Sequence, residues 1–220
     1  MQASTYRMAW VSAAAFAVLL SWDFSGLDVA MAQVAGGGGG FPLRDNWLLD
    51  TVLHDGAKYA AWLFELALCL MVFWPLGPLA RIPFARRLQL AVSVVLGAGL
   101  ITALKATSHT SCPWDLREFG GVARHLSHWT GWLKPDGGGG HCFPAGHASS
   151  GFAFLGGYFA FRHDEPRIAR LWLLAALAAG LVFGFSQQLR GAHFMSHTLW
   201  TGWLCWMSAW LTDRLTGRAA

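Results

Sequence analysis

Two histidines and an arginine lie close together near the end of the chain, in a short polar stretch between two apolar runs. Arg190 and His193 precede the second run, and His197 follows His193 by four residues. Residues four apart share one face of a helix, so His197 could orient the His193 ring or modulate its proton. Imidazole titrates near neutral pH, which suits a nucleophile or a general acid and base.

A second polar stretch opens another apolar run. It reads Pro144, Ala145, Gly146 and His147. Glycine lets the backbone approach a ligand closely, and free amide groups at the start of a helix favour a bound phosphate. We therefore expect Ala145 and Gly146 to contact a phosphate, with His147 standing beside it.

A third stretch supplies cations. Lys105 ends an apolar run and Arg117 follows in a long polar segment, where both are suited to binding an anion. If the three stretches meet, His193 and His147 flank the bound phosphate. One histidine would attack phosphorus and become a phosphohistidine, and the other would protonate the leaving oxygen and then activate water.

The composition indicates a polytopic membrane protein. Of 220 residues, 55% are apolar and only 13% are charged, whereas a soluble domain has about a quarter charged residues. The 13 tryptophans favour membrane interfaces. The net charge of +4 does not require nucleic acid, because no basic run is interleaved with aromatic residues. We expect membrane lipids as partners and no nucleic acid, while protein partners and the oligomeric state stay open.

Six apolar runs predict an all-α fold with six transmembrane helices. The runs cover residues 8–22, 59–76, 88–104, 148–161, 171–185 and 194–211. Several are shorter than the roughly 17–25 residues that a membrane crossing needs, so the helices must extend into their flanks. For the first run the alternative is a signal peptide with a cleavage site at Ala30-Met31-Ala32. We expect one domain, in which 1–58 hold the first span and an outer amphipathic segment, and 59–220 form a five-span bundle with an outer loop at 106–143.

Charge places the three polar stretches on one side of the membrane. Six spans put both termini on the same side, and the short arginine-rich segments 79–87 and 162–170 then face the cytoplasm. The opposite, outer side holds the polar segments 36–58, 105–147 and 187–193. Residues 41–58 have apolar positions at helical spacing and are expected to lie as a helix on the membrane surface. We interpret His54 and Asp55 there as a solvated pair, although they could reach the site.

The outer segment also contains a pair of cysteines, Cys112 and Cys142. In an oxidising compartment they would form a disulfide. It would close a loop of about 30 residues, which is worth roughly 3–4 kcal/mol in the chain-entropy model. The alternatives are two free thiols, or a metal-binding pair with nearby histidines. Cys69 and Cys205 lie inside spans and are interpreted as small packing residues.

The three stretches resemble the motif blocks of the type 2 phosphatidic acid phosphatase superfamily, in its bacterial integral-membrane branch. Its blocks are written K-x6-R-P, P-S-G-H and S-R-x5-H-x3-D, and the resemblance covers nearly the whole chain from the second span onward. The matching residues are Lys105 and Pro113, then Pro144, Gly146 and His147, then Ser186 and His193. The resemblance implies six helices, a site near the outer surface, His193 as nucleophile and His147 as general acid.

Four positions depart from these blocks. Cys112 and Gln187 stand where arginines are expected, Ala145 replaces the serine, and His197 replaces the aspartate that orients the nucleophile. Arg117 and Arg190 could supply the missing charge from shifted positions, since Arg190 lies about one helical turn beyond position 187. His197, as a neutral acceptor, would hold His193 in one tautomer.

The expected function is therefore hydrolysis of a lipid phosphate or diphosphate at the outer face of a bacterial inner membrane, without a metal or other cofactor. Phosphate transfer between lipids through the same phosphohistidine is the close alternative. A catalytically silent lipid-phosphate binder is another, because a fold does not determine a function. A metal or haem site is the last, since His193 and His197 have the spacing of helical ligands that His147, His141 and His109 could join.

Overall fold

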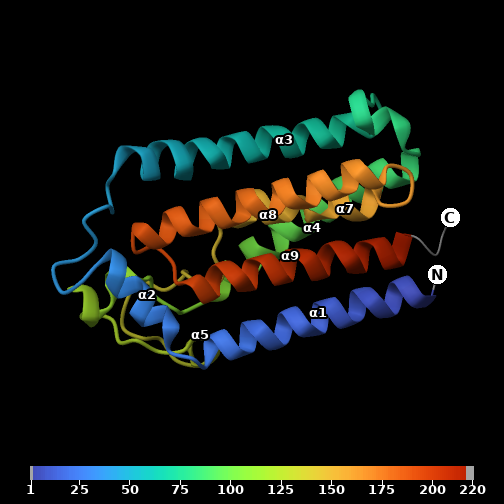
Figure 1. Cartoon of the computed structure of the whole chain (residues 1–220). Helices are drawn as coiled ribbons and strands as arrows, with labels where there is room; N and C mark the ends of the chain where they lie inside the picture. The colour runs from blue at the N-terminus through green and yellow to red at the C-terminus, as the bar shows by residue number, and fades with distance from the viewer. Residues whose placement is uncertain (1, 217–220) are drawn as a thin grey trace.

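The computed structural model describes residues 2–216, with side chains from residue 6 onward, and within that range it is all-helical without a β-strand. Its long helices lie side by side (Figure 1). They are α1 (Gln2–Asp23), α3 (Ala57–Met71), α4 (Phe84–Thr107), α8 (Pro166–Leu189) and α9 (Met195–Thr216). The fourth apolar run forms a broken helix of three short pieces, α6 (Ser149–Phe152), η5 (Ala153–Leu155) and α7 (Gly156–Phe161).

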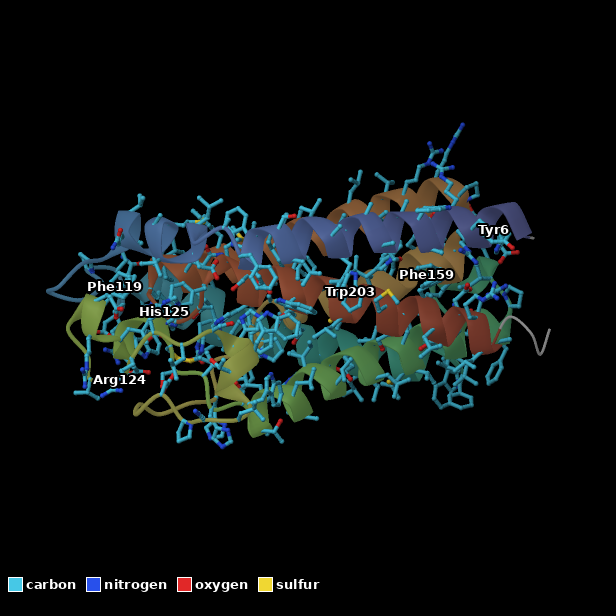
Figure 2. The ribbon with its side chains drawn as sticks, turned by 90° about the horizontal axis from the view of Figure 1, so that it is seen from below. Tyr6, Phe119, Arg124, His125, Phe159 and Trp203 are labelled. Carbon is cyan, nitrogen blue, oxygen red and sulfur yellow. A yellow bond between two sulfur atoms is a disulfide. The ribbon has the colours of Figure 1, made fainter. Side chains whose placement is uncertain are left out.

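Most of the loops and several short helices gather at one end of the bundle, opposite the start of α1 and the end of α9 (Figure 1). This loop end contains α2 (Leu27–Ala35), η1 (Leu48–Gly56), η3 (Pro113–Asp115), η4 (Arg117–Phe119) and α5 (His128–Gly131). At the opposite end, η2 (Gly77–Arg81) joins α3 to α4. Phe119, Arg124 and His125 lie at the loop end, far from Tyr6 at the other end (Figure 2). All the polar stretches that the sequence analysis singles out therefore lie toward the same end.

Of the helices within residues 2–216, two are long and apolar enough to cross a membrane by length and composition. They are α4 and α8, with mean hydropathies of 1.8 and 2.0. Residues 6–23 and 27–35 pass the same test as a pair, but the pair is bent by 69°. The bend falls at Gly26, whose φ of 73° suits glycine because it has no Cβ. The apolar helices thus support membrane association with two or three crossings, and six crossings stay a prediction.

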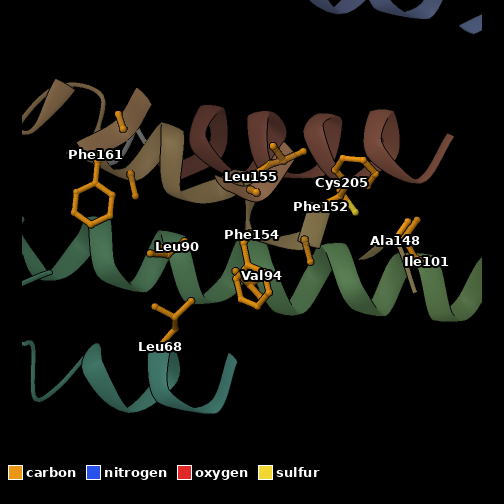
Figure 3. Close-up of a cluster of buried hydrophobic side chains, with 14 of the residues drawn as sticks. Leu68, Leu90, Val94, Ile101, Ala148, Phe152, Phe154, Leu155, Phe161 and Cys205 are labelled. Carbon is orange, nitrogen blue, oxygen red and sulfur yellow. The ribbon is translucent and has the colours of Figure 1, made fainter. Parts of the chain in front are cut away.

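The main hydrophobic core lies between α4, the broken helix and α9. Figure 3 shows Val94 of α4 beside Phe154, with Leu90 and Ile101 of the same helix and Leu155 among the other residues of this core, all of them buried. Close approach to α8 is possible because small residues stand at the crossing. A Cβ atom at Gly151 would collide with the α8 backbone at Gly180, as in small-residue contacts between membrane helices.

A buried ion pair network closes the end of the bundle opposite the loops. Asp213 of α9 is 4% exposed and accepts hydrogen bonds from Arg86 of α4 at 3.2 Å and from Arg162 at 2.7 Å. Gln89 also donates to it at 3.2 Å. These contacts join three helices, and the arginines that perform this role come from the segments expected to face the cytoplasm.

The N-terminal helices pack against α9. The indole of Trp203, which lies beside α1 (Figure 2), donates to the carbonyl of Ser12 at 3.2 Å, and Trp206 donates to the Ser12 hydroxyl at 2.8 Å. In α2, Asp28 accepts from the Ser196 backbone amide at 3.0 Å and from the Ser196 hydroxyl. Because Ser196 is in the first turn of α9, Asp28 caps that helix from another part of the chain.

The surface helix predicted over 41–58 is only partly present. Helical structure begins at Leu48, runs as the π-helical segment η1, and continues directly into α3. Leu49 is buried, whereas Asp50 and His54 are partly exposed. The segment therefore lies over the loop end of the bundle and extends α3 toward it.

Candidate functional site

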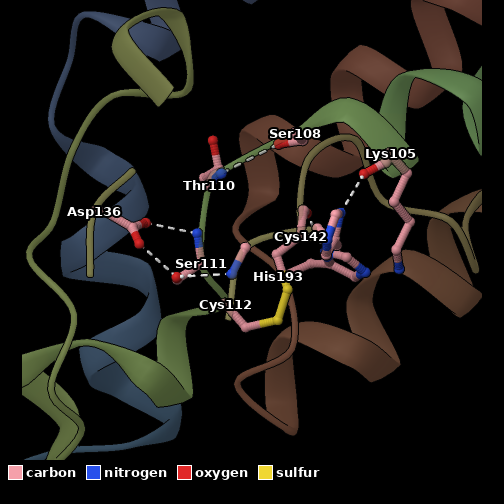
Figure 4. The surroundings of a disulfide bond; sticks show 10 residues. Lys105, Ser108, Thr110, Ser111, Cys112, Asp136, Cys142 and His193 are labelled. Atoms are coloured by element: carbon pink, nitrogen blue, oxygen red, sulfur yellow. Dashed lines mark hydrogen bonds between the residues drawn. A yellow bond between two sulfur atoms is a disulfide. The ribbon is translucent and has the colours of Figure 1, made fainter. Parts of the chain in front are cut away.

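The loop after α4 is folded back on itself and cross-linked. Cys112 and Cys142 form a disulfide with their Cα atoms 5.1 Å apart (Figure 4). The Cys142 amide donates to the carbonyl of Thr110 at 2.9 Å, and Asp136 accepts from both the amide and the hydroxyl of Ser111 at 2.7 and 2.6 Å. These contacts fix the backbone that leads from the end of α4 to Pro144.

The Cys142 carbonyl holds the first histidine. His193 is 3% exposed, and its Nδ1–H donates to the Cys142 carbonyl at 2.8 Å. With the proton on Nδ1, the Nε2 lone pair is free for chemistry. Burial, followed by the positive charges of Lys105 and neighbouring histidines, lowers the pKa of His193 well below its usual value. His193 is therefore an uncharged imidazole at neutral pH.

His197 does not orient His193 in the expected way. The two ring centroids are 5.8 Å apart, and the acceptor for the His193 Nδ1–H is the Cys142 carbonyl instead. The His197 ring is 1% exposed, and its Nδ1 has no hydrogen-bond partner among the described residues. It lines a small polar cavity of about 100 Å³ together with Asp23, Asp28, Thr110, Asp136 and His128. In this structure a backbone carbonyl therefore orients the His193 ring, and a role of His197 in the chemistry stays a prediction.

Lys105 and Gly146 lie beside each other. A Cβ atom at Gly146 would stand 3.4 Å from the Lys105 Nζ, so glycine leaves room for the ammonium group at this turn. Ala145 differs from the expectation, because it is fully buried and its amide donates to the His197 carbonyl at 3.2 Å. The Ala145 amide is therefore occupied within the protein and is not free to bind an anion.

His147 follows this turn and is half-buried. Burial is the main cause that lowers its pKa to about 3, and the positive charges of His54, Lys105, Lys58 and Arg190 lower it further. An imidazole surrounded by cations is uncharged at neutral pH while the site holds no anion. A bound dianion would reverse the charge effect and favour the protonated ring.

Arg190 reaches the site from the C-terminal end of α8 and is 6% exposed. Its Nη1 donates to the Gln187 side chain at 3.0 Å. Arg190 therefore contacts the residue that stands at the motif position where an arginine was expected. Its Nε donates to the Arg44 carbonyl at 2.7 Å, and its Nη2 pairs with Asp50 at 2.5 Å. Arg190 is thus a cation of the site, and it is held in position on three sides.

Arg117 is not part of this cluster. It is exposed, its Nε donates to the Val122 carbonyl at 3.1 Å, and it is not among the charges that act on His147 or His193. Its short helix η4 folds against residue 123 within the same loop. Local bonds therefore keep the Arg117 side chain in the loop, and no contact among the described residues supports the expectation that it supplies positive charge to the site.

The sequence analysis missed a contribution from η1. The His54 ring stacks on the His147 ring with centroids 3.7 Å apart and an angle of 29° between the planes. Asp50, four residues earlier, pairs with Arg190. The interpretation of His54 and Asp55 as a purely solvated pair is wrong for His54. The signal that could have found it is the spacing of Asp50 and His54, which puts both on one helical face.

Metal binding was one of the alternatives for these histidines. Among residues 2–216, no three His, Cys, Asp or Glu side chains converge in a way that could hold a metal ion. The polar groups of the site are instead mainly imidazoles and cations, and its Asp50 carboxylate is paired with Arg190, an arrangement suited to an anion.

Comparison with known protein families gives a match for this chain. The sequence model of the PAP2 superfamily matches residues 86–219, which is more than half of the chain and includes Lys105, His147 and His193. No curated protein and no solved structure matches the chain.

Proposed function

Because the chain belongs to the PAP2 superfamily, whose members are generally phosphatases acting on phosphate esters, we propose that it hydrolyses a lipid phosphate or diphosphate. The reaction would take place at the outer face of a bacterial inner membrane. The observation that carries this proposal is the meeting of two uncharged histidines, His193 and His147, with Lys105 and Arg190 at one end of the bundle.

In the first step, the phosphate would be held by Lys105 and Arg190, which neutralise its charge. The Nε2 lone pair of His193 attacks phosphorus, so that a P–N bond forms and the ester P–O bond breaks. His147, protonated once the dianion is bound, gives its proton to the leaving oxygen. The Nδ1–H of His193 stays on the Cys142 carbonyl, which orients the ring throughout.

In the second step, His147 takes a proton from water while the water oxygen attacks phosphorus. The P–N bond breaks, inorganic phosphate leaves, and both histidines return to their starting state. A carbonyl stabilises the developing charge on His193 less than a carboxylate would, because it carries only a partial negative charge. We therefore expect turnover to be slow for this chemistry.

An apolar groove supports a lipid as substrate. It runs between α3 and α8 with a volume of about 640 Å³ and is lined mainly by small and aromatic residues, including Ala60, Phe64, Ala179 and Phe183. Ser150 and Gly151, just after His147, also line it. An acyl or prenyl chain placed there would have its phosphate end beside the histidines.

The placement in the membrane is part of the same proposal. Six spans with both ends in the cytoplasm would put the site outside, and the arginines around Asp213 inside. The long helices shown side by side in Figure 1 are compatible with this arrangement. An alkaline phosphatase fusion after residue 130 should be active and one after residue 165 inactive, and the reverse pattern would overturn the orientation.

The function is tested by phosphate release from purified protein in detergent with EDTA. The substrates are phosphatidic acid, phosphatidylglycerol phosphate, a polyprenyl diphosphate and lipid A. His193→Ala and His147→Ala should abolish release, while His109→Ala, which changes an exposed loop histidine, should not. Loss of substrate phosphate without free phosphate, with label appearing on a second lipid, would indicate transfer instead. No reaction with any of these lipids would refute the proposal.

A further inference from the structure

The segment η1 covers one side of the histidine site with two polar residues. Asp50 pairs with Arg190, and His54 lies flat on His147. π-helical segments are rare in proteins. Those that occur are often found at functional sites, because they re-aim side chains that a regular helix would place elsewhere. Neither residue belongs to the motif blocks or to the matched region 86–219.

The motif positions leave the site short of positive charge. The first expected arginine is Cys112, which is in the disulfide, and the second is Gln187, which binds Arg190. Each of the three Arg190 side-chain nitrogens already contacts a protein oxygen. A phosphate dianion beside His147 would therefore have near it the ammonium groups of Lys105 and Lys58, whose charges both act on His147, and the guanidinium of Arg190, which it must share with protein oxygens.

His54 has the surroundings of a histidine that can become a cation. Its Nδ1 lies 3.0 Å from Asp55 Oδ1 and 3.8 Å from Asp50 Oδ1, and both carboxylates favour the charged ring. With Nδ1 turned to Asp55, Nε2 is the atom available to a ligand. Burial, followed by the charge of Arg190, lowers the pKa of His54 in the empty site. A bound anion would oppose the effect of Arg190.

We propose that His54 is an additional phosphate-binding residue of this site, which takes up a proton when the phosphate binds and supplies the positive charge that the motif positions lack. The inference rests on the proposed function, because it assumes that a phosphate occupies the space beside His147. The charged and titratable groups around the His54–His147 stack come from every neighbouring element. They are Asp50 and Asp55 on η1, Lys58 on α3, Lys105 on α4, Arg190 after α8, and His193.

Proton uptake separates this role from a purely structural stack. If His54 becomes protonated on binding, anion affinity falls as the pH rises above the pKa of His54 in the empty site, by up to about tenfold per pH unit. His147 would also take up a proton, so the quantity to compare is the number of protons bound per anion with and without His54. Sulfate is a suitable probe, because it stays a dianion throughout this pH range.

The variants are chosen to separate charge from stacking. His54→Phe keeps a flat ring on His147 but cannot be charged, and His54→Lys carries a permanent charge without a ring. His109→Phe is the matched control, because His109 is an exposed histidine of the same loop end. His54 itself is 28% exposed, so its replacement should leave the fold intact, and thermal unfolding of each variant checks this.

Sulfate binding by the detergent-solubilised protein would be measured by titration calorimetry at about pH 6 and about pH 8, in buffers of different ionisation enthalpy. His54→Phe should bind sulfate about tenfold more weakly at the lower pH and take up fewer protons, by as much as one. A tenfold loss of affinity is the size expected for the loss of one charge-assisted contact. His54→Lys should restore the affinity but not the proton uptake.

Wild-type affinity and wild-type proton uptake in His54→Phe would overturn the inference, as would a loss of affinity that His54→Lys does not restore. Absence of sulfate binding by the wild type would overturn it as well. The proposed function fails separately, if the wild type releases no phosphate from any lipid while sulfate binding still depends on His54. If lipid hydrolysis requires His193 and His147 but His54→Phe behaves as wild type, only the inference on His54 fails.

Discussion

Removing the Cys112–Cys142 disulfide tests how the site is held together. The two residues are separated by 30 positions, and closing such a loop stabilises the fold by about 3.6 kcal/mol in the chain-entropy model. Replacing both cysteines with alanine should lower the free energy of unfolding by roughly that amount. For a chain of this size the corresponding fall in Tm is about 7–14 °C.

The effect on catalysis should be much smaller than the effect on stability. The Cys142 amide would still donate to Thr110 at 2.9 Å, and this contact helps to hold the carbonyl that orients His193. Weakening that single hydrogen bond costs about 1 kcal/mol, or roughly fivefold in rate. We therefore expect kcat to fall several-fold in the double variant and to disappear in His193→Ala.

Thermal unfolding and phosphate release would be measured on the wild type, on the Cys112→Ala/Cys142→Ala variant, and on the wild type after reduction. Cys69→Ala is the control, because it removes a free cysteine outside the loop. A double variant that melts within about 2 °C of the wild type would show that the loop is held without the bond. A loss of kcat as complete as that of His193→Ala would refute the argument that the carbonyl keeps its place through the backbone.

The remaining predictions concern charge. Arg190→Ala should lower kcat/KM by about a hundredfold or more because it removes a buried cation of the site, whereas Arg117→Ala should change it by less than about twofold, as steady-state kinetics would show. His147 has its pKa lowered from 6.5 to about 3 in the empty site, so its contribution to stability is present above pH 6.5 and is lost as the pH falls toward 3. His147→Gln should accordingly reduce the difference in Tm between about pH 7.5 and about pH 4.5, and His109→Gln should not. Asp213→Asn breaks a buried ion pair network far from the site and should destabilise the protein by about 3–5 kcal/mol without changing kcat per folded molecule, a pattern that activity before and after heating would reveal.

The sequence predicts the parts of the site that depend on helix ends. Lys105, His147 and His193 each stand where an apolar run begins or ends, so helical packing alone brings them to one end of the bundle. The family resemblance is confirmed by the match to residues 86–219, whereas the roles of these three residues stay predictions. The number of membrane crossings stays a prediction, because the structure has two or three helices of sufficient length and hydropathy.

The sequence could not predict which backbone groups would already be hydrogen-bonded within the protein. A motif names side chains, but the acceptor for His193 is the Cys142 carbonyl and the Ala145 amide is bound to the His197 carbonyl. Such bonds depend on the path of a loop, which has no periodic pattern. The choice between Arg117 and Arg190 has the same origin, since Arg190 follows directly from a helix and Arg117 lies in a loop with its own local bonds.

The contribution of η1 to the site could not be predicted from the sequence for a different reason. A helix can be recognised from its apolar positions, but its rotation relative to a neighbour depends on tertiary packing. His54 and Asp55 are adjacent in sequence and their side chains lie 3.0 Å apart, yet it is His54 that stacks on the His147 ring. A π-helical turn changes that rotation further, and the spacing of apolar residues in 41–58 does not predict such a turn.

Three contacts described above cross from the N-terminal segment to the region shared with the family. Asp28 caps α9, Asp50 pairs with Arg190, and His54 lies on His147. The matched region begins at residue 86, so none of these three N-terminal residues would be carried along if that region were grafted onto another protein. A chimera that joins residues 86–219 to the leading helices of a relative should insert and fold as a bundle, yet it would lack the anchoring of its own arginine and histidine. For this chain, the exchangeable unit is therefore the whole sequence from α1 to α9.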